Sequence, residues 1–259
     1  MFRSPGAVLV QVGPVSLRWY GVVLATAMAA GVWLATRVAR RRGLDAFEML
    51  KAAELALLGG LIGARLYYVL FAWDYYGQDP WRVLAIWEGG SALHGGLIGG
   101  LLTGGAYAWR RGLPLARYLD AAAPSLALGQ AIGRWGDFFN EQAFGTPTSL
   151  PWGLYISPSH RPLPFLQDQF FHPAFLYESV WSLLVFVVLL ASRPRLAPAA
   201  GALFLCYLGL SSFGRVWVEA IRTDPLMLGS FRVSQLVGAV GVALALWGVP
   251  RLRKRAPVA

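Results

Sequence analysis

Residues 88–100 read Glu-Gly-Gly-Ser-Ala-Leu-His-Gly-Gly-Leu-Ile-Gly-Gly, which places a histidine at the start of a long apolar segment. The stretch Ser91–Trp109 is almost entirely apolar around His94, and its paired glycines are spaced so that another helix can come close. Because an ionisable group is costly inside a lipid bilayer, a histidine in such a segment indicates a functional site.

The composition of the chain is typical of a membrane protein that crosses the bilayer several times. Of its 259 residues, 56% are hydrophobic and only 14% are charged, and the mean hydropathy is +0.51. The net charge of +10 comes from short basic clusters between apolar runs, which argues against a nucleic-acid partner. The single cysteine, Cys206, excludes a disulfide framework and a cysteine metal cluster.

Seven segments are long and apolar enough for transmembrane helices, which need ~20 residues at a rise of ~1.5 Å each. Some of them qualify only if one buried ionisable group is allowed. The predicted spans are Trp19–Thr36, Leu55–Ala72, Ser91–Trp109, Tyr118–Arg134, Pro173–Ser192, Leu196–Arg215 and Val233–Pro250. The sequence therefore predicts an all-α polytopic membrane protein that forms one domain over residues 1–259.

The basic residues predict the orientation of these spans. Alternate connections hold 14 of the 23 lysines and arginines, in residues 37–51, 110–117, 193–195 and 251–255. The positive-inside rule puts these connections in the cytoplasm, with the N-terminus outside and the C-terminus inside. The long loop 135–172 then lies outside, where it is long enough to form a small cap.

Polar groups from six predicted helices fall into the outer third of the bilayer when residues are counted from the helix ends. These groups are Tyr20, Arg65, His94, Arg134, Glu178 and Arg215, and Glu219 and Arg222 share a face with Arg215 if its helix continues. Each group alone has a structural explanation, such as snorkelling or an ion pair. Together they indicate a shared polar cavity. Arginines in a cavity favour an anionic ligand, and at this depth the phosphate of a phospholipid headgroup fits best.

Six strings of residues, in the same order, resemble the bacterial prolipoprotein diacylglyceryl transferases over nearly the whole chain. They are Arg18–Gly21, Gly63–Tyr68, Trp87–Gly90 with His94–Gly99, Gly133–Gly145, His172–Glu178, and Gly214-Arg215 with Glu219 and Arg222. The resemblance implies a seven-helix protein of the bacterial cytoplasmic (inner) membrane, with a periplasmic cap and an active site that faces the outer leaflet.

The activity that the resemblance implies is the first step of bacterial lipoprotein maturation. The diacylglyceryl group of phosphatidylglycerol moves to the lipobox cysteine thiol of a prolipoprotein, which forms a thioether and releases glycerol 1-phosphate. No cofactor takes part. Such a displacement needs a base near the thiol and cations on the departing phosphate.

The resemblance also implies roles for individual residues of this chain. The expected catalytic residues are His94, Arg134 and Arg215. The expected substrate-binding residues are Tyr20, Arg65, Arg134, Asn140, Glu141, Gly145, Glu178, Glu219 and Arg222. The base is either His94 or a nearby carboxylate.

The chain departs from the family pattern just after Arg134. Asp137 stands where the family usually has asparagine, and it adds a negative charge near the expected anion site. Eight residues after the arginine the family places a glutamate, often preceded by glutamine, whereas this chain has the order Glu141-Gln142. Either Glu141 reaches the same place by a local shift, or that glutamate is dispensable here.

Three other functions fit the sequence less well. An anion or lipid transporter needs polar groups that lead to both faces, whereas the inner halves of these spans are apolar. An intramembrane serine protease needs its serine and histidine on facing helices, but Ser91 and His94 lie on one helix. A CDP-alcohol phosphotransferase needs several aspartates on neighbouring helices, and Asp120 and Asp137 do not make that pattern, so no metal is expected.

Overall fold

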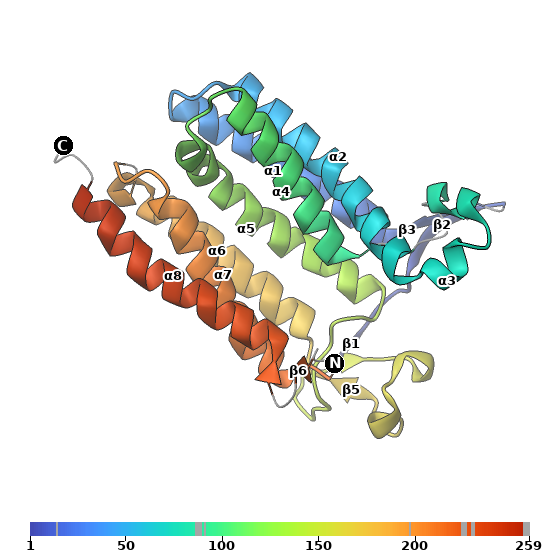
Figure 1. Cartoon of the computed structure of the whole chain (residues 1–259). Coiled ribbons are helices and arrows are strands. Elements are labelled where there is room, and N and C mark those ends of the chain that lie inside the picture. Colours follow the sequence, from blue (N-terminus) through green and yellow to red (C-terminus); the bar gives the residue numbers. More distant parts are fainter. Residues whose placement is uncertain are drawn as a thin grey trace. The chain divides into compact units, whose positions relative to one another are not determined.

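The computed structural model describes residues 1–13, 15–85, 90, 92–196, 198–223, 227–228 and 231–255, and its long elements are all helices (Figure 1). Seven helices in these residues have at least 18 residues. They are α1 (Trp19–Arg41), α2 (Ala46–Phe71), α4 (Leu93–Arg110), α5 (Leu115–Phe139), α6 (Ala174–Leu196), α7 (Ala202–Ile221) and α8 (Val233–Arg255). Each of them overlaps one of the seven predicted spans.

The remaining elements are short. Helix α3 (Trp73–Tyr76) and a 3₁₀ helix (Pro80–Leu84) follow α2, and two more 3₁₀ turns lie at Pro158–His160 and Leu163–Phe165. Strand β4 pairs in parallel with β1 and antiparallel with β5, and two antiparallel hairpins join β2 to β3 and β6 to β7. The strands are β1 (Phe2–Arg3), β2 (Val8–Val12), β3 (Val15–Arg18), β4 (Leu154–Tyr155), β5 (Phe170–Phe171), β6 (Met227–Leu228) and β7 (Phe231–Arg232).

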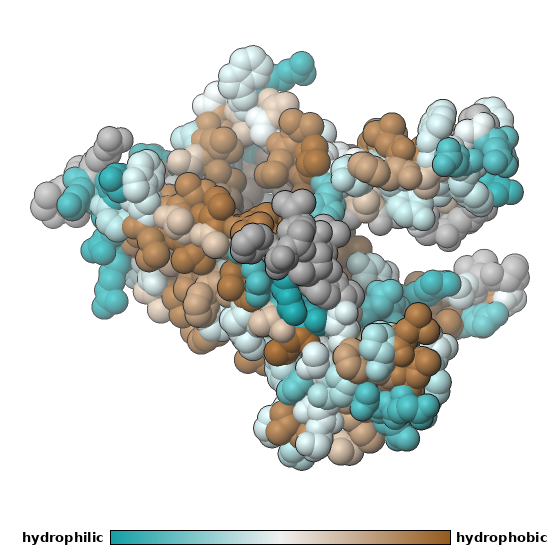
Figure 2. All heavy atoms as spheres, turned by 60° about the horizontal axis from the view of Figure 1, so that its bottom comes forward, coloured by the Kyte–Doolittle hydropathy of each residue, from teal (hydrophilic) through white to brown (hydrophobic). Residues whose placement is uncertain are grey.

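Within the described residues, five helices, α1, α2, α6, α7 and α8, are long and apolar enough to cross a membrane. Their apolar side chains face outward as well as inward: Val187 on α6 and Leu246 on α8 are more than half exposed. Figure 2 shows apolar residues over much of the helical surface. Such a surface suits lipid rather than water, so the protein is a multi-pass membrane protein.

Several helix ends differ from the predicted spans; for example, α1 ends at Arg41 rather than Thr36, and α7 begins at Ala202 rather than Leu196. Helix α2 begins at Ala46 rather than Leu55, because Oδ1 of Asp45 accepts hydrogen bonds from the amides of Phe47 at 2.8 Å and Glu48 at 3.4 Å. Helix α5 runs to Phe139, so the long loop comprises residues 140–172.

Helix α7 continues past Arg215 and ends at Ile221. Arg215 and Glu219 therefore share one helical face, as predicted. The prediction that Arg222 extends this face is wrong, because Arg222 has an extended backbone (ψ 146°) just beyond the helix.

The chain folds into two compact units, one of Met1–Leu34 with Leu119–Ala259 and the other of Ala35–Tyr118. In the second unit, α2 and α4 pack through glycines that leave no room for a side chain. An ideal Cβ on Gly63 would lie 2.4 Å from the carbonyl oxygen of Gly95, and one on Gly99 would lie 2.2 Å from that of Gly59. The glycine pairs in the sequence thus serve close helix packing.

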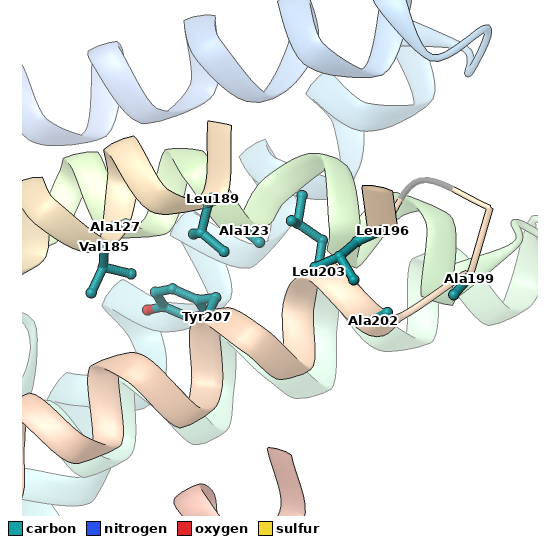
Figure 3. Close-up of a cluster of buried hydrophobic side chains, with 9 residues drawn as sticks. All are labelled: Ala123, Ala127, Val185, Leu189, Leu196, Ala199, Ala202, Leu203 and Tyr207. Carbon is teal, nitrogen blue, oxygen red and sulfur yellow. The ribbon is translucent and has the colours of Figure 1, made fainter. Parts of the chain in front are cut away.

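The core of the first unit lies where α5, α6 and α7 meet. Its buried cluster comprises Ala123, Ala127, Val185, Leu189, Leu196, Ala199, Ala202, Leu203 and Tyr207 (Figure 3). Asp120 on α5 is 1% exposed, and its carboxylate accepts hydrogen bonds at 2.8 Å from the amides of Gly201 and Phe204. This ionisable group therefore caps the start of α7.

Candidate functional site

Two arginines of the first unit share one buried glutamate. Glu178 lies in the second turn of α6 and is 7% exposed. Its Oε2 atom forms an ion pair with Nη2 of Arg134 on α5, and its Oε1 atom accepts a hydrogen bond at 3.2 Å from Nη1 of Arg215 on α7. One carboxylate therefore joins three helices and holds the two guanidinium groups near each other.

Two more carboxylates complete this ion-pair network. Nη2 of Arg215 lies 3.3 Å from Oε2 of Glu219, one helical turn away. Nη1 of Arg134 donates a hydrogen bond at 3.1 Å to Oδ2 of Asp137. The structure therefore brings Arg134, Glu178, Arg215 and Glu219 together, as the sequence predicted.

Burial differs between the two kinds of charge in the network. The side chains of Glu178 and Glu219 are 8% and 3% exposed, whereas those of Arg134 and Arg215 are 30% and 35% exposed. The carboxylates of Glu178 and Glu219 thus lie deeper in the protein than the two guanidinium groups and hold them from the buried side. Each guanidinium has five N–H donors, so both arginines can still bind a second anion from the exposed side.

Tyr20 lies beside the same turn of α5. It is the second residue of α1, and an ideal Cβ on Gly136 would come 2.8 Å from Cδ2 of its ring. Gly136 stands between Arg134 and Asp137 in the sequence, so the tyrosine packs against the backbone that carries both charged groups. The predicted proximity of Tyr20 to this site is confirmed.

An apolar cavity of about 500 Å³ adjoins this turn of α5. Its walls come from α1, α5 and α6, and they include Trp19, Thr26, Ile132, Trp135 and Leu183. Ile132 and Trp135 flank Arg134 in the sequence. A cationic group and an apolar cavity therefore lie within one turn of the same helix.

Arg65 and His94 belong to the second unit. The buried Arg65 side chain donates hydrogen bonds to the carbonyl oxygens of Val83, Gly90, Arg82 and Ala85 at 2.6–3.1 Å. These contacts fix the segment between α2 and α4. His94 is the second residue of α4 and is exposed, with its ring 6.3 Å from that of Tyr67. Residues 86–89 and Ser91 of the motif around it lie outside the described residues.

Glu141 faces the long loop. Its Oε2 atom accepts hydrogen bonds from the amide of Ser157 at 3.0 Å and from the Ser157 hydroxyl, and it lies 2.9 Å from Nδ1 of His160. Burial raises the pKa of the Glu141 carboxyl, but the hydrogen bonds with His160 and Ser157 outweigh this effect and hold its pKa below the usual range. Sequence reasoning missed Ser157 and His160, because no motif connects them to a glutamate that lies 16 and 19 residues earlier.

The positions of Gly145 and Arg222 are explained by packing. An ideal Cβ on Gly145 would lie 2.9 Å from both Cβ of His172 and the carbonyl oxygen of Ile221. The backbone of Gly145 forms a β-bridge with Arg222. This contact attaches the start of the long loop to the end of α7, and the predicted substrate-binding roles of both residues stay predictions.

Among the described residues, no three His, Cys, Asp or Glu side chains are grouped so that they could hold a metal ion. The site is thus built from arginines, carboxylates and a tyrosine. Guanidinium groups can stabilise a negative charge that develops on an oxygen atom, which is what a departing phosphate requires.

Comparisons with known proteins agree with this chemistry. The family model described as prolipoprotein diacylglyceryl transferase matches residues 7–250. A relative from Nostoc sp. is 48% identical, over 98% of this chain and 93% of its own length. Relatives from Synechococcus elongatus (47%; 96% and 88%) and Gloeobacter violaceus (42%; 98% and 95%) also match. All three are named phosphatidylglycerol–prolipoprotein diacylglyceryl transferase. The chain therefore belongs to the prolipoprotein diacylglyceryl transferase family and is a transferase.

Proposed function

We propose that this protein transfers the diacylglyceryl group of phosphatidylglycerol to the lipobox cysteine of a prolipoprotein, which yields a thioether and glycerol 1-phosphate. The observation that carries the proposal is the pair of partly exposed arginines held by one buried glutamate. The names of relatives 42–48% identical over nearly the whole chain support the same substrates.

In the reaction, the cysteine thiolate attacks the glycerol carbon that carries the phosphate ester. The carbon–sulfur bond forms as the carbon–oxygen bond breaks, and the electron pair goes to the phosphate oxygen. Arg134 and Arg215 stabilise the charge on that oxygen, and Glu178 keeps them in place before substrate arrives. Tyr20, Glu219 and Asp137 complete the surroundings of this phosphate site.

The thiol proton must leave before or during the attack, and we assign its acceptance to His94. A neutral imidazole is a suitable base for a thiol of pKa ~8.5. His94 is exposed at the first turn of α4, so its ring is open to a ligand. The expected roles of Arg65, Asn140, Glu141, Gly145 and Arg222 in substrate binding belong to this proposal.

The apolar cavity beside Arg134 suits a lipid chain. A phospholipid combines an anionic phosphate with hydrocarbon, and one turn of α5 carries both Arg134 and two residues of the cavity wall, Ile132 and Trp135. We place the enzyme in the bacterial cytoplasmic membrane as one seven-helix domain. Its N-terminus and active site then face the outer side, as the basic clusters predict.

The test is a reaction in vesicles. Purified protein is incorporated into phosphatidylglycerol vesicles and mixed with a prolipoprotein that contains one lipobox cysteine. Mass spectrometry should show the diacylglyceryl thioether, together with one released glycerol phosphate per product. A prolipoprotein with serine in place of that cysteine, and vesicles of phosphatidylcholine alone, should give neither. Lipid or anion movement across the vesicle without a thioether would support a transporter instead.

A further inference from the structure

A second, more polar cavity lies in the extramembrane part of the first unit. Its volume is about 340 Å³, at the lower end of the ~300–1,000 Å³ of small-ligand sites. Its walls are the segment Arg3–Ala7, the last residue of α5 with the two that follow it (Phe139, Asn140 and Glu141), and Ser157 with His160. Glu141, Ser157 and His160 belong to the loop between α5 and α6, which the positive-inside rule puts outside the membrane. With that orientation, a water-soluble ligand can reach the cavity.

One wall presents a fixed hydrogen-bond acceptor. Among the described contacts, every hydrogen bond to the Glu141 carboxylate ends at Oε2, where Ser157 and His160 hold it. The Oε1 atom is thus available to a donor on a ligand. Because the carboxylate is already ordered, little conformational entropy is lost when it accepts that bond.

Arg3, in the N-terminal part of the lining, supplies a donor. The backbone of Arg3 is fixed by the pairing of β1 with β4, and its guanidinium lies over the Tyr155 ring at 4.9 Å. A guanidinium stacked on a ring keeps its N–H groups at its edge, where they can donate to a ligand. His160 turns Nδ1 toward Glu141, and its side chain is 53% exposed.

We propose that this cavity binds a short stretch of backbone of the polypeptide that accepts the diacylglyceryl group. This inference rests on the function proposed above. A peptide chain presents N–H donors and carbonyl acceptors in alternation, and the cavity offers an acceptor at Glu141 and a donor at Arg3. The phosphodiester of a lipid offers acceptors but no donor, so it would give no hydrogen bond to Oε1 of the Glu141 carboxylate. The pairing of one donor with one acceptor therefore favours a polypeptide backbone over a lipid phosphate.

Steady-state kinetics of two variants test the proposal. Full-length Arg3→Gln and Glu141→Gln are assayed in phosphatidylglycerol vesicles, with polypeptide and lipid each varied while the other is saturating. Each variant should raise the apparent KM for the polypeptide about tenfold, the expected loss for one charge-assisted hydrogen bond. In Arg3→Gln, the kcat and the KM for phosphatidylglycerol should stay unchanged. Asp168→Asn removes a loop carboxylate outside the cavity and is the matched control.

Arg3→Gln keeps the proposal testable if Glu141→Gln loosens the loop, because Arg3 makes none of the described contacts that hold Glu141. An unchanged polypeptide KM in Arg3→Gln, or a raised KM for phosphatidylglycerol instead, overturns the assignment.

Photocrosslinking identifies the occupant directly and also separates this inference from the proposed function. A benzophenone amino acid at position 3 should form an adduct with the polypeptide. Adducts with phospholipid alone, or no adduct, contradict the proposal. If the wild-type chain makes no thioether, the proposed function fails. If it does make the thioether but neither kinetics nor crosslinking involves the cavity, only the present inference fails.

Discussion

Glu178 gives one carboxylate oxygen to each of two arginines, so removal of either arginine has two effects. The first is the loss of a cation from the proposed phosphate site. The second is a buried carboxylate left with a single partner, which is strongly destabilising in protein interiors. Variants at these residues must therefore be measured for stability as well as for activity.

Arg134→Ala and Arg215→Ala should each lower kcat by ~10²–10³, because each removes a charged donor from the departing phosphate. Lysine at either position should restore little activity, since a point charge cannot replace the two parallel N–H donors of a guanidinium group. Initial rates at saturating substrate measure the change in kcat. In Arg134→Ala, the further change Glu178→Gln should recover thermal stability but not activity. Near-normal turnover by both alanine variants would exclude the arginines from the mechanism.

His94→Gln should change the pH dependence of the reaction. If His94 accepts the thiol proton, the variant loses the acidic limb of the pH–rate profile. It should also recover relatively more activity at high pH, where a thiol of pKa ~8.5 ionises without help. Reaction rates measured between pH 5.5 and 9.5 test whether His94 accepts this proton. An unchanged profile with a large rise in the KM for phosphatidylglycerol would make His94 a binding group.

Acid should release the long loop from Glu141. In the unfolded chain a glutamate titrates near pH ~4.3, and the pKa of folded Glu141 lies below its usual range. The stabilisation is therefore complete above pH ~4.3 and is lost as the pH falls through the lower, folded pKa. Hydrogen exchange of peptides over residues 155–161 should be slower in the wild type than in Glu141→Gln at pH 5.5. The two should converge once the pH is below the folded pKa of Glu141, and a difference that does not change with pH would contradict this assignment.

At the scale of elements, the contact of α2 with α4 depends on the absence of side chains. Gly99 cannot carry a Cβ without a collision with the backbone of Gly59, whereas a Cβ on Gly105 of the same helix meets nothing within 4 Å. Position 99 of α4 thus requires glycine, whereas position 105 of the same helix can accept a larger side chain.

Gly99→Ala should destabilise the protein by ~1–3 kcal/mol through overpacking. Gly105→Ala should be neutral or stabilise it by up to ~1 kcal/mol, because alanine favours a helix more than glycine does. Thermal unfolding in one detergent, followed by size-exclusion chromatography, compares the two. Equal melting temperatures would show that α2 and α4 can move apart without a loss of stability.

The helices themselves could be predicted from hydropathy, but their ends could not. The sequence before Leu55 is charged and reads as a connection, yet α2 already begins at Ala46 because Asp45 caps it. Arg215 suggested the end of a span, yet α7 continues because Glu178 and Glu219 pair with this arginine. Counting residues from the helix ends could predict that Arg134 lies at the same depth as Glu178. It could not predict the contacts of Ser157 and His160 with Glu141, since these depend on the path of a loop without periodicity.

At the scale of the whole molecule, the distribution of basic residues predicts the sidedness of every connection. In a Cys206→Ser background, single cysteines at the exposed positions Ala116 and Arg253 should resist a membrane-impermeant thiol reagent in intact cells. Cysteines at Gln78 and Gln167 should react. Labelling after cell disruption controls for buried sites, and equal labelling of positions 78 and 116 in intact cells would refute the orientation.

The pairing of β1 with β4 has a consequence for biosynthesis. Phe2 pairs with Leu154, so this residue leaves the ribosome long before its partner is made. At ~5–20 residues per second, this interval is roughly 8–30 s. During that time α1, α2, α4 and α5 are synthesised, while the partner strand of β1 has not yet been made. The cavity between Arg3 and Ser157, whose walls come from both ends of this interval, is thus completed only after His160 has been made.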